Sequence, residues 1–368
     1  MQNIKYFITG GGTGGHIYPA LAILNALVNS GVDKKTQIFY LGNKNNLEYQ
    51  ITKEQDINFL HYSVCGMPRK ISFKLLKFAV ELFFSTIKAL FYALKYKPNV
   101  IFATGGYVCA PILFVAKFLK IPYVLHDCDA HPGIVSRTFA SGAKYMSLAF
   151  DSAINLVKTK NPKVCGNPIR AEFKNLDKIS ARNSLNLGDK FTVLIMGGSL
   201  GAKTINNATF SVIEKYANDE NIQIIWQTGK KNYQEVLNKI GDKLPKNLLL
   251  RPYFENMTQA LIASDVVISR AGSLSLSEIC ACGLPSILIP YPYAAADHQR
   301  INAKKMCELG ASVYLDDNDC NGEKLLEILS NLIIDKNKLD KMAQNAKNNA
   351  KINATCEILE LINKAVEK

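Results

Sequence analysis

Short apolar runs alternate with amphipathic segments along most of the chain, as in proteins whose parallel strands are joined by helices. Each half begins with a strand, a glycine-rich turn and a helix, and the last segment, Lys336 to Lys368, is helical without a strand. The pattern predicts an α/β protein with two similar halves. Strands are expected near residues 4–9, 37–41, 57–62, 99–103, 122–126, 144–148 and 162–165, and in a second series near residues 191–196, 222–228, 247–251, 265–269, 285–290 and 312–315.

The segment from Ile71 to Lys95 differs from an ordinary crossover helix. At about 100° per residue its charged side chains fall in a stripe roughly 60° wide, and most of the remaining circumference is apolar or aromatic. Because charges interrupt any apolar run of about 18–20 residues, we do not expect it to span a bilayer. We interpret it as an interfacial surface, with burial by its own domain or by a dimer partner as the alternative. The surface residues expected are Phe73, Lys74, Lys77, Phe78, Phe84 and Lys88.

Composition narrows the class of protein. A chain of 368 residues exceeds one typical domain, and 48% hydrophobic with 20% charged residues is ordinary for a globular protein with a sizeable core. The nine cysteines include no Cys-x-x-Cys pair, and the chain opens on a core strand without a signal-peptide pattern. We therefore expect reduced thiols and a cytoplasmic location.

The positive charge is concentrated in the first part of the chain. The net charge is +13, and residues 1–160 hold 18 Lys and Arg against 8 Asp and Glu. No nucleic-acid-binding motif or basic-aromatic platform is present, so we expect no nucleic acid. An anionic membrane surface or lipid is the partner that this charge favours.

The run Thr9 to His16 (TGGGTGGH) is the strongest local signal. A glycine-rich turn between the first strand and the first helix lets the backbone approach a phosphorylated ligand. The run satisfies Gly-x-Gly-x-x-Gly, but the strand near 37–41 is not followed by the acid that a dinucleotide ribose needs, and the Gly-Lys-Ser/Thr of an NTPase loop is missing. A turn that only packs helix on strand is the other alternative. It accounts poorly for five glycines in six residues followed by a titratable His16.

A second constellation lies between Asp265 and Ala303. The strand near 265–269 ends in Arg270-Ala-Gly, and the next helix begins with small residues whose free amides can bind a phosphate. Arg270 is suited to offset pyrophosphate charge, and Glu278 to accept hydrogen bonds from two adjacent ribose hydroxyls. Polar side chains at 297–302 can bind sugar hydroxyls. A merely solvated role for these side chains is the alternative.

Five motifs together resemble a known family. They occur in family order, span nearly the whole chain, and resemble the MurG family of glycosyltransferase family 28. The motifs are at residues 10–22, 104–107, 166–170, 197–202 and 269–303. The resemblance implies the GT-B fold, an α/β architecture of two Rossmann-like domains whose parallel sheets face each other across a deep cleft. It also implies an acceptor- and membrane-binding domain at 1–165, a UDP-N-acetylglucosamine (UDP-GlcNAc) domain at 166–345, and a helical tail at 346–368 that packs back on the first domain.

The same resemblance implies a reaction. GlcNAc would pass from UDP-GlcNAc to the muramyl O4 of undecaprenyl-pyrophosphoryl-MurNAc-pentapeptide, with inversion, in peptidoglycan synthesis. The enzyme would be peripheral, at the cytoplasmic face of the inner membrane. Two other functions stay open: a related transferase that glycosylates diacylglycerol or another lipid, and a nucleotide-sugar-binding protein without catalysis.

Residue by residue, the resemblance places the donor mainly on the second domain. Arg270 and the amides of Ser273 and Leu274 would meet the nucleotide and phosphates, and Glu278 the ribose. Phe254 stands where the family often has an aliphatic residue near uracil, and its amide and carbonyl remain available for contacts. The other donor contacts implied are Ser277, Gln299, Ser199 and Arg170, with Thr13, Gly14 and Gly15 closing from the first domain.

The chain departs from the family pattern at residues 126–133. The family reads His-Glu-Gln-Asn where this chain has His126-Asp127-Cys128-Asp129, so Asp129 replaces an asparagine expected at the sugar. Asp127 and Asp129 also form the Asp-x-Asp pattern of metal-dependent transferases with another fold. We expect no metal, because glycine turns, helix N-termini and Arg270 can hold a pyrophosphate.

An inverting transfer needs one in-line displacement and a base that removes the proton of the acceptor hydroxyl. His16 is the expected base, because the pKa of a histidine suits this task near neutral pH. Asp129 is the rival candidate.

Overall fold

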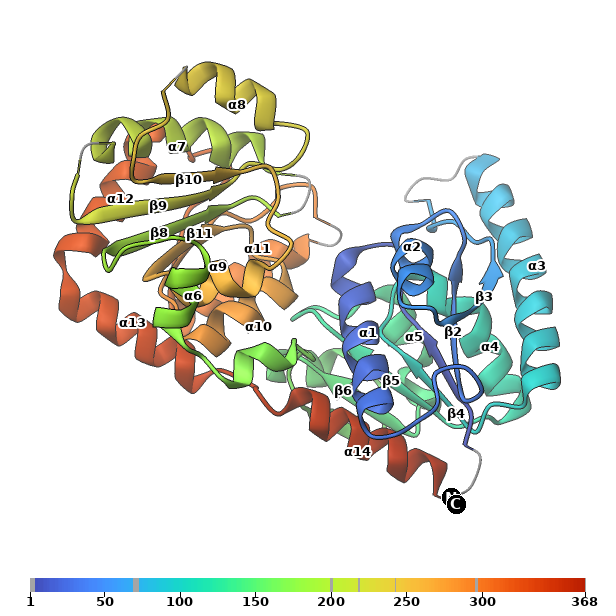
Figure 1. Ribbon diagram of the computed structural model, residues 1–368. Helices are drawn as coiled ribbons and strands as arrows, with labels where there is room; N and C mark the ends of the chain where they lie inside the picture. The colour runs from blue at the N-terminus through green and yellow to red at the C-terminus, as the bar shows by residue number, and fades with distance from the viewer. Residues whose placement is uncertain are drawn as a thin grey trace. The chain divides into compact units, whose positions relative to one another are not determined.

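The computed structural model describes residues 4–68, 73–198, 201–217, 219–241, 243–294 and 297–367. It contains two compact units, one formed by Met1–Arg170 with Ile352–Lys368 and the other by Ala171–Lys351. The second unit is thus inserted into the first, and the last helix, α14 (Ala354–Val366), packs against α1 (Gly14–Asn29) (Figure 1).

A parallel seven-stranded sheet forms the centre of the first unit, in the order β3-β2-β1-β4-β5-β6-β7. Ile8 in β1 stands opposite Tyr40 of β2 on one side and Phe102 of β4 on the other. Every strand expected in this half is present. The strands are β1 (Tyr6–Thr9), β2 (Ile38–Asn43), β3 (Asn58–Tyr62), β4 (Val100–Ala103), β5 (Tyr123–Asp127), β6 (Tyr145–Leu148) and β7 (Pro162–Val164).

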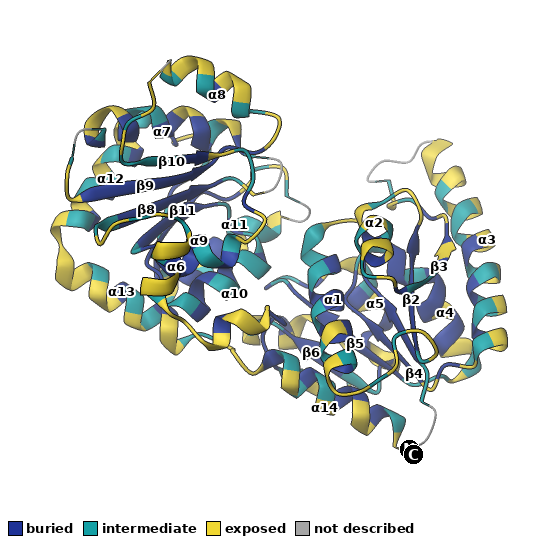
Figure 2. Ribbon diagram, viewed as in Figure 1, coloured by how far each residue is buried: buried dark blue, intermediate teal, exposed yellow. Residues whose placement is uncertain are grey.

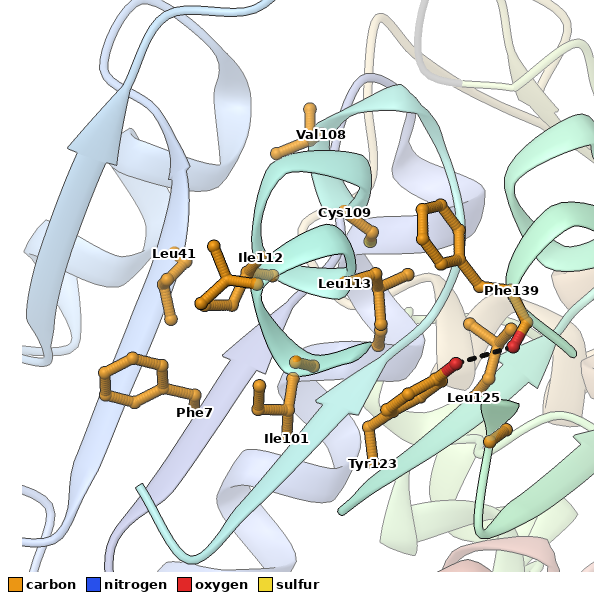
Figure 3. Close-up of a cluster of buried hydrophobic side chains, with 14 of the residues drawn as sticks. Phe7, Leu41, Ile101, Val108, Cys109, Ile112, Leu113, Tyr123, Leu125 and Phe139 are labelled. Atoms are coloured by element: carbon orange, nitrogen blue, oxygen red, sulfur yellow. Dashed lines mark hydrogen bonds between the residues drawn. The ribbon is translucent and has the colours of Figure 1, made fainter. Parts of the chain in front are cut away.

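Helices cover both faces of this sheet, since successive strand residues point to opposite sides. Phe7, Ile101 and Leu125 pack with the helices of one face, and Figure 3 shows them beside Ile112 and Leu113 of α4. The Tyr123 hydroxyl donates to Phe139 O (2.7 Å) in the same cluster. The opposite face is covered by α1 and α14. The other helices are α2 (Leu47–Glu54), α3 (Phe73–Tyr96), α4 (Ala110–Leu119) and α5 (Ile134–Phe139), with 3-10 turns at Tyr107–Cys109, Ala140–Gly142 and Asp151–Leu156.

The second unit has a parallel six-stranded sheet in the order β10-β9-β8-β11-β12-β13. Its core contains Trp226, which is fully buried among residues of α7 and neighbouring strands. The strands are β8 (Phe191–Met196), β9 (Ile222–Gln227), β10 (Leu248–Arg251), β11 (Val266–Ser269), β12 (Ser286–Leu288) and β13 (Ser312–Tyr314). The helices are α6 (Lys178–Ser184), α7 (Lys203–Tyr216), α8 (Tyr233–Ile240), α9 (Met257–Ala263), α10 (Ser273–Cys282), α11 (His298–Glu308), α12 (Gly322–Ile334) and α13 (Lys336–Asn348), after a 3-10 turn at Ala171–Lys174.

Candidate functional site

His16 lies in the first turn of α1, and its side chain is fixed by one strand end. Its Nδ1–H donates to Thr104 O (2.9 Å), because a carbonyl can only accept, and Thr104 Oγ1 donates to His16 O (2.6 Å). A neutral imidazole that donates through Nδ1 keeps a lone pair on Nε2. The ring is therefore held in the tautomer that can remove a proton.

Glycines make room for this ring. A Cβ on Gly106 would lie 3.0 Å from His16 Cδ2 and 2.6 Å from Gly11 O, and one on Gly105 would lie 3.6 Å from His16 Cε1. Gly106 also has φ 77° and ψ 159°, a backbone conformation that is essentially restricted to glycine. The Thr104-Gly105-Gly106-Tyr107 motif thus seats the histidine.

The turn Gly10–Gly12 is packed tightly by side chains. A Cβ on Gly10 would lie 2.1 Å from Thr104 Oγ1, and one on Gly12 would lie 2.7 Å from Tyr107 Cε1. Thr13, at the N-cap of α1, is exposed, and Gly14 and Gly15 are half-buried; the Thr13 side chain makes no capping hydrogen bond to the helix. The amides that begin α1 are therefore not capped by Thr13.

A buried acid that no sequence motif indicated lies behind this turn. Glu48 of α2 is fully buried, and its Oε1 accepts from Asn43 N and from Asn46 Nδ2, both at 3.2 Å. Its Oε2 has no hydrogen-bond partner among the described residues. A Cβ on Gly11 would lie 2.6 Å from Glu48 Oε1. The acid absent from the end of β2 is supplied from α2, but it supports the turn and does not reach solvent.

Asp127 organises segment 126–133, the segment that departs from the family pattern. This carboxylate is buried, accepting from Asp129 N (3.0 Å) and Gly133 N (3.1 Å). Burial raises the pKa of Asp127, and the nearby Asp129 carboxylate raises it further. Asp129 is half-buried on the same loop. Within the described ranges, no three His, Cys, Asp or Glu side chains are grouped to hold a metal ion.

His126 joins two of the sequence motifs. Its Nε2–H donates to Asn167 Oδ1 (3.1 Å), and its Nδ1 accepts from the Ser147 hydroxyl (3.0 Å). Asn167 Nδ2 donates in turn to Cys128 O (3.2 Å). Complete burial lowers the pKa of His126 to about 4. The Gly166-Asn167-Pro168 motif therefore fastens segment 126–133 through a neutral histidine.

The second constellation occupies the carboxyl end of β11 and the start of α10. Gly272 is the N-cap of α10, with no side-chain cap, and no described atom lies within 4 Å of the Cβ that it lacks. Ser273 is buried, while Leu274, Ser277 and Glu278 are half-buried. The uncapped first amides and the dipole of α10 favour an anion here.

Arg270 is held more firmly than the sequence indicates. Its Nη1 donates to Ile289 O (3.0 Å), Pro290 O (3.1 Å) and Asp317 Oδ1 (2.5 Å). Its Cζ lies 5.7 Å from the centroid of the Tyr291 ring. No local motif predicts Asp317 as the partner of Arg270, because it follows Arg270 by 47 positions in the sequence.

The other donor residues expected from the sequence lie in several places. Phe254 is buried, and its N–H already donates to Gln227 Oε1 (2.9 Å), so the amide offered to uracil is in use. Gln299 Oε1 accepts from Tyr291 N (3.0 Å). Arg170 is exposed, with Cζ 6.0 Å from the Tyr18 ring centroid in the first unit. Ser199 lies outside the described residues.

Helix α3 exposes many apolar side chains, and Figure 2 shows the exposed parts of the helix in yellow. Ser85, Ala89 and Ala93 form its buried side, and Phe73 is 94% exposed. Phe78 differs from expectation, because it is half-buried and packs against the core. We define the α3 surface as the exposed side chains Leu76, Val80, Phe83, Phe84, Ile87, Phe91 and Leu94.

Lysines lie beside the α3 surface. Lys74 and Lys77 are exposed, whereas Lys88 is half-buried with its Nζ 3.0 Å from His61 Nε2. Among the residues that the structure describes, no helix combines the length and apolarity needed to cross a bilayer.

Comparison with known families accounts for both units. Residues 6–147 match the glycosyltransferase family 28 N-terminal domain, and residues 192–357 match the family's C-terminal domain. A crystal structure of Acinetobacter baumannii MurG superposes with a TM-score of 0.78 at 26% identity, covering 98% of this chain and 99% of that one. The expected GT-B architecture of two Rossmann-like domains is confirmed.

Curated relatives match over nearly the full length. Two of them are named UDP-N-acetylglucosamine--N-acetylmuramyl-(pentapeptide) pyrophosphoryl-undecaprenol N-acetylglucosamine transferase. The protein from Desulforamulus reducens is 37% identical over 372 residues (99% of this chain, 100% of the relative), and that from Acetivibrio thermocellus is 37% identical over 361 residues (98% and 97%). The chain therefore belongs to glycosyltransferase family 28, and the resemblance to MurG expected from its motifs is confirmed.

Proposed function

We propose that this chain transfers GlcNAc from UDP-GlcNAc to the MurNAc O4 of the undecaprenyl-pyrophosphoryl-MurNAc-pentapeptide, the lipid-linked step of peptidoglycan synthesis. The observation that carries the proposal is the 37% identity, over 99% of the chain, to a transferase with this activity in its name. The chain is thus a hexosyltransferase whose substrates are a nucleotide sugar and a lipid-linked muramyl acceptor.

His16 is the base in our proposed mechanism. Its Nε2 takes the proton of the acceptor hydroxyl while O4 attacks the anomeric carbon of GlcNAc. The bond from that carbon to the β-phosphate oxygen breaks, and UDP leaves with the electron pair, which inverts the configuration. The bond from Nδ1 to Thr104 O orients the ring and, after proton transfer, stabilises the imidazolium.

The donor binds the second unit in this proposal. Arg270 and the first amides of α10 offset the pyrophosphate charge, Glu278 accepts from the ribose hydroxyls, and Gln299 contacts the sugar. No metal is required, since fixed N–H dipoles and a guanidinium stabilise the leaving UDP. The remaining residues assigned to the donor are Thr13, Gly14, Gly15, Asp129, Arg170, Ser199, Phe254, Ser273, Leu274 and Ser277.

One assay tests the reaction and the base. Purified protein is incubated with UDP-GlcNAc and either the muramyl lipid or diacylglycerol, and UDP release is measured. We expect UDP release with the muramyl lipid and not with diacylglycerol. In His16→Ala we expect a kcat about 100- to 10,000-fold lower, with the affinity for UDP-GlcNAc nearly unchanged. Release only with diacylglycerol, or with neither lipid, contradicts the proposed reaction. An active His16→Ala with an inactive Asp129→Ala transfers the role of base to Asp129.

The α3 surface is our candidate for membrane attachment at the cytoplasmic face of the inner membrane. Its exposed apolar side chains can enter the headgroup boundary while Lys74 and Lys77 meet anionic lipids. We expect co-sedimentation with phosphatidylglycerol-rich vesicles, weaker binding to phosphatidylcholine, and several-fold loss in Phe84→Ser/Phe91→Ser. Ile334→Ser removes an exposed apolar side chain of the second unit and is the matched control. Equal binding by both variants contradicts the assignment. We propose no role for nucleic acid.

A further inference from the structure

Asp317 follows the edge strand of the second sheet, at the end where the donor motifs lie. It comes three residues after β13, and the chain before it is fixed by Leu315 N, which donates to Leu288 O (3.0 Å) in β12. Its side chain is 14% exposed, and that of Arg270 is 13% exposed. The pair is therefore largely shielded from solvent, where a charge-assisted hydrogen bond is stronger than at the surface.

Within the described ranges, the hydrogen bonds of the Arg270 side chain all come from one nitrogen. Nη1 donates to Asp317 Oδ1, Ile289 O and Pro290 O, and the guanidinium lies near the Tyr291 ring. Among the described residues, Nε and Nη2 make no hydrogen bond. These two donors form one edge of the planar fork, which is the edge that binds phosphate oxygens in pairs.

The second carboxylate oxygen of Asp317 reaches another part of the unit. Thr204 Oγ1 donates to Asp317 Oδ2 (3.2 Å), and Thr204 lies in the first turn of α7, shortly after Gly201. One carboxylate thus ties the end of β11 to the start of α7. Both places lie at helix N-termini, α10 after β11 and α7 after β8. They are on the edge of the sheet at which ligands of open α/β sheets bind.

We infer that Asp317 is a positioning residue for UDP-GlcNAc: by binding Arg270 through Nη1, it leaves the Nε–Nη2 edge of the guanidinium directed to the pyrophosphate. This inference rests on the proposed donor site. The contact with Thr204 keeps the carboxylate in the orientation that this requires. Without it, Arg270 would still bear its charge but would pay more conformational entropy to bind the phosphates.

The test compares Asp317→Ala with Asp317→Asn, which retains an acceptor oxygen. We expect Asp317→Ala to raise the KM and the calorimetric Kd for UDP-GlcNAc about tenfold with kcat within about twofold. Asp317→Asn should stay within about threefold of wild type. Asp319→Ala, in the same loop but exposed, is the matched control and should change neither constant. An unchanged Asp317→Ala, or an Asp317→Asn as weak as it, overturns the inference.

Two further measurements keep the outcome interpretable. Adding Asp317→Ala to Arg270→Ala should cause no additional loss of affinity, because the aspartate acts only through the arginine. If Asp317→Ala does not fold, as judged by Trp226 fluorescence, Thr204→Val replaces it and should raise the Kd by a smaller factor; an unchanged Kd then contradicts the inference. A wild-type chain that does not bind UDP-GlcNAc overturns the proposed function itself.

Discussion

The turn before α1 and the turn before α10 both join a strand to a helix that lacks a side-chain cap, but their glycines have different surroundings. At Gly10, Gly11 and Gly12, side chains from other segments fill the space that a Cβ would occupy. At Gly272 no described atom lies within 4 Å of that position. The first turn needs glycine for its own packing, whereas the second leaves a helix N-terminus open to a ligand.

This difference shows that a glycine pattern alone does not identify what the glycines are for. The first turn is closely packed and supports His16. The second turn has a backbone that any residue can adopt, since Gly272 has φ −67° and ψ 134°. Substitution should therefore damage folding at one turn and ligand binding at the other.

Gly10→Ala should have the largest effect. Its Cβ would lie 2.1 Å from Thr104 Oγ1 and 2.6 Å from the backbone oxygen of His16, which leaves no space for repacking. We expect a loss of about 3 kcal/mol in the free energy of unfolding, with a large fall in kcat because His16 is displaced. Urea unfolding followed by far-UV circular dichroism measures it.

The single tryptophan makes this prediction local. Trp226 belongs to the second unit, so its fluorescence midpoint in urea should stay unchanged in Gly10→Ala. An equal shift of both midpoints would show that the turn stabilises more than the first unit.

Acid should also weaken the first unit. The pKa of His126 falls from 6.5 to about 4 on folding, so the unfolded chain binds more protons between these values and stability declines as the pH falls through that window. We expect a loss of about 2 kcal/mol between pH 7 and pH 5. The raised pKa of Asp127 acts in the opposite direction, so the measurement is the difference from His126→Gln. A wild-type protein that loses no more stability than His126→Gln in this window contradicts the prediction.

Gly272→Ala should have the smallest effect, about 1.4 kcal/mol, and only on the donor. A methyl group at the N-cap of α10 would enter the space where a phosphate reaches the free amides. We expect a tenfold higher KM for UDP-GlcNAc and a free energy of unfolding within about 0.5 kcal/mol of wild type. Gly188→Ala, whose Cβ would make only ordinary contacts at 3.7 Å or more, serves as the control in the same unit. An unchanged KM would mean that the donor does not approach this turn.

Most of the fold follows from local patterns. All the expected strands are present, because buried parallel strands are continuous apolar runs such as Phe191–Met196. The helix expected from Ile71 is described from Phe73 to Tyr96; residues 71 and 72 lie outside the described ranges. The periodicity indicated its apolar character. It did not indicate that Ala89 and Ala93 lie on the buried side, because that depends on contacts with segments distant in the sequence.

The site was less predictable, because its supporting contacts join distant parts of the chain. Arg270 pairs with Asp317, His126 with Asn167, and Gly11 is packed by Glu48. No local pattern encodes such pairs. The amide of Phe254 shows the same limit, since Gln227, from another strand, already accepts its hydrogen bond.

The return of α14 to the first unit has a consequence for synthesis on the ribosome. Ile358, Leu361 and Ile362 complete the core beside α1, yet they are translated only after the whole second unit. Until they emerge, the nascent first unit exposes the apolar face that they cover. This exposed apolar face is a surface that chaperones bind. A premature stop codon in the second unit would leave that unit incomplete and would also remove α14 from the first unit.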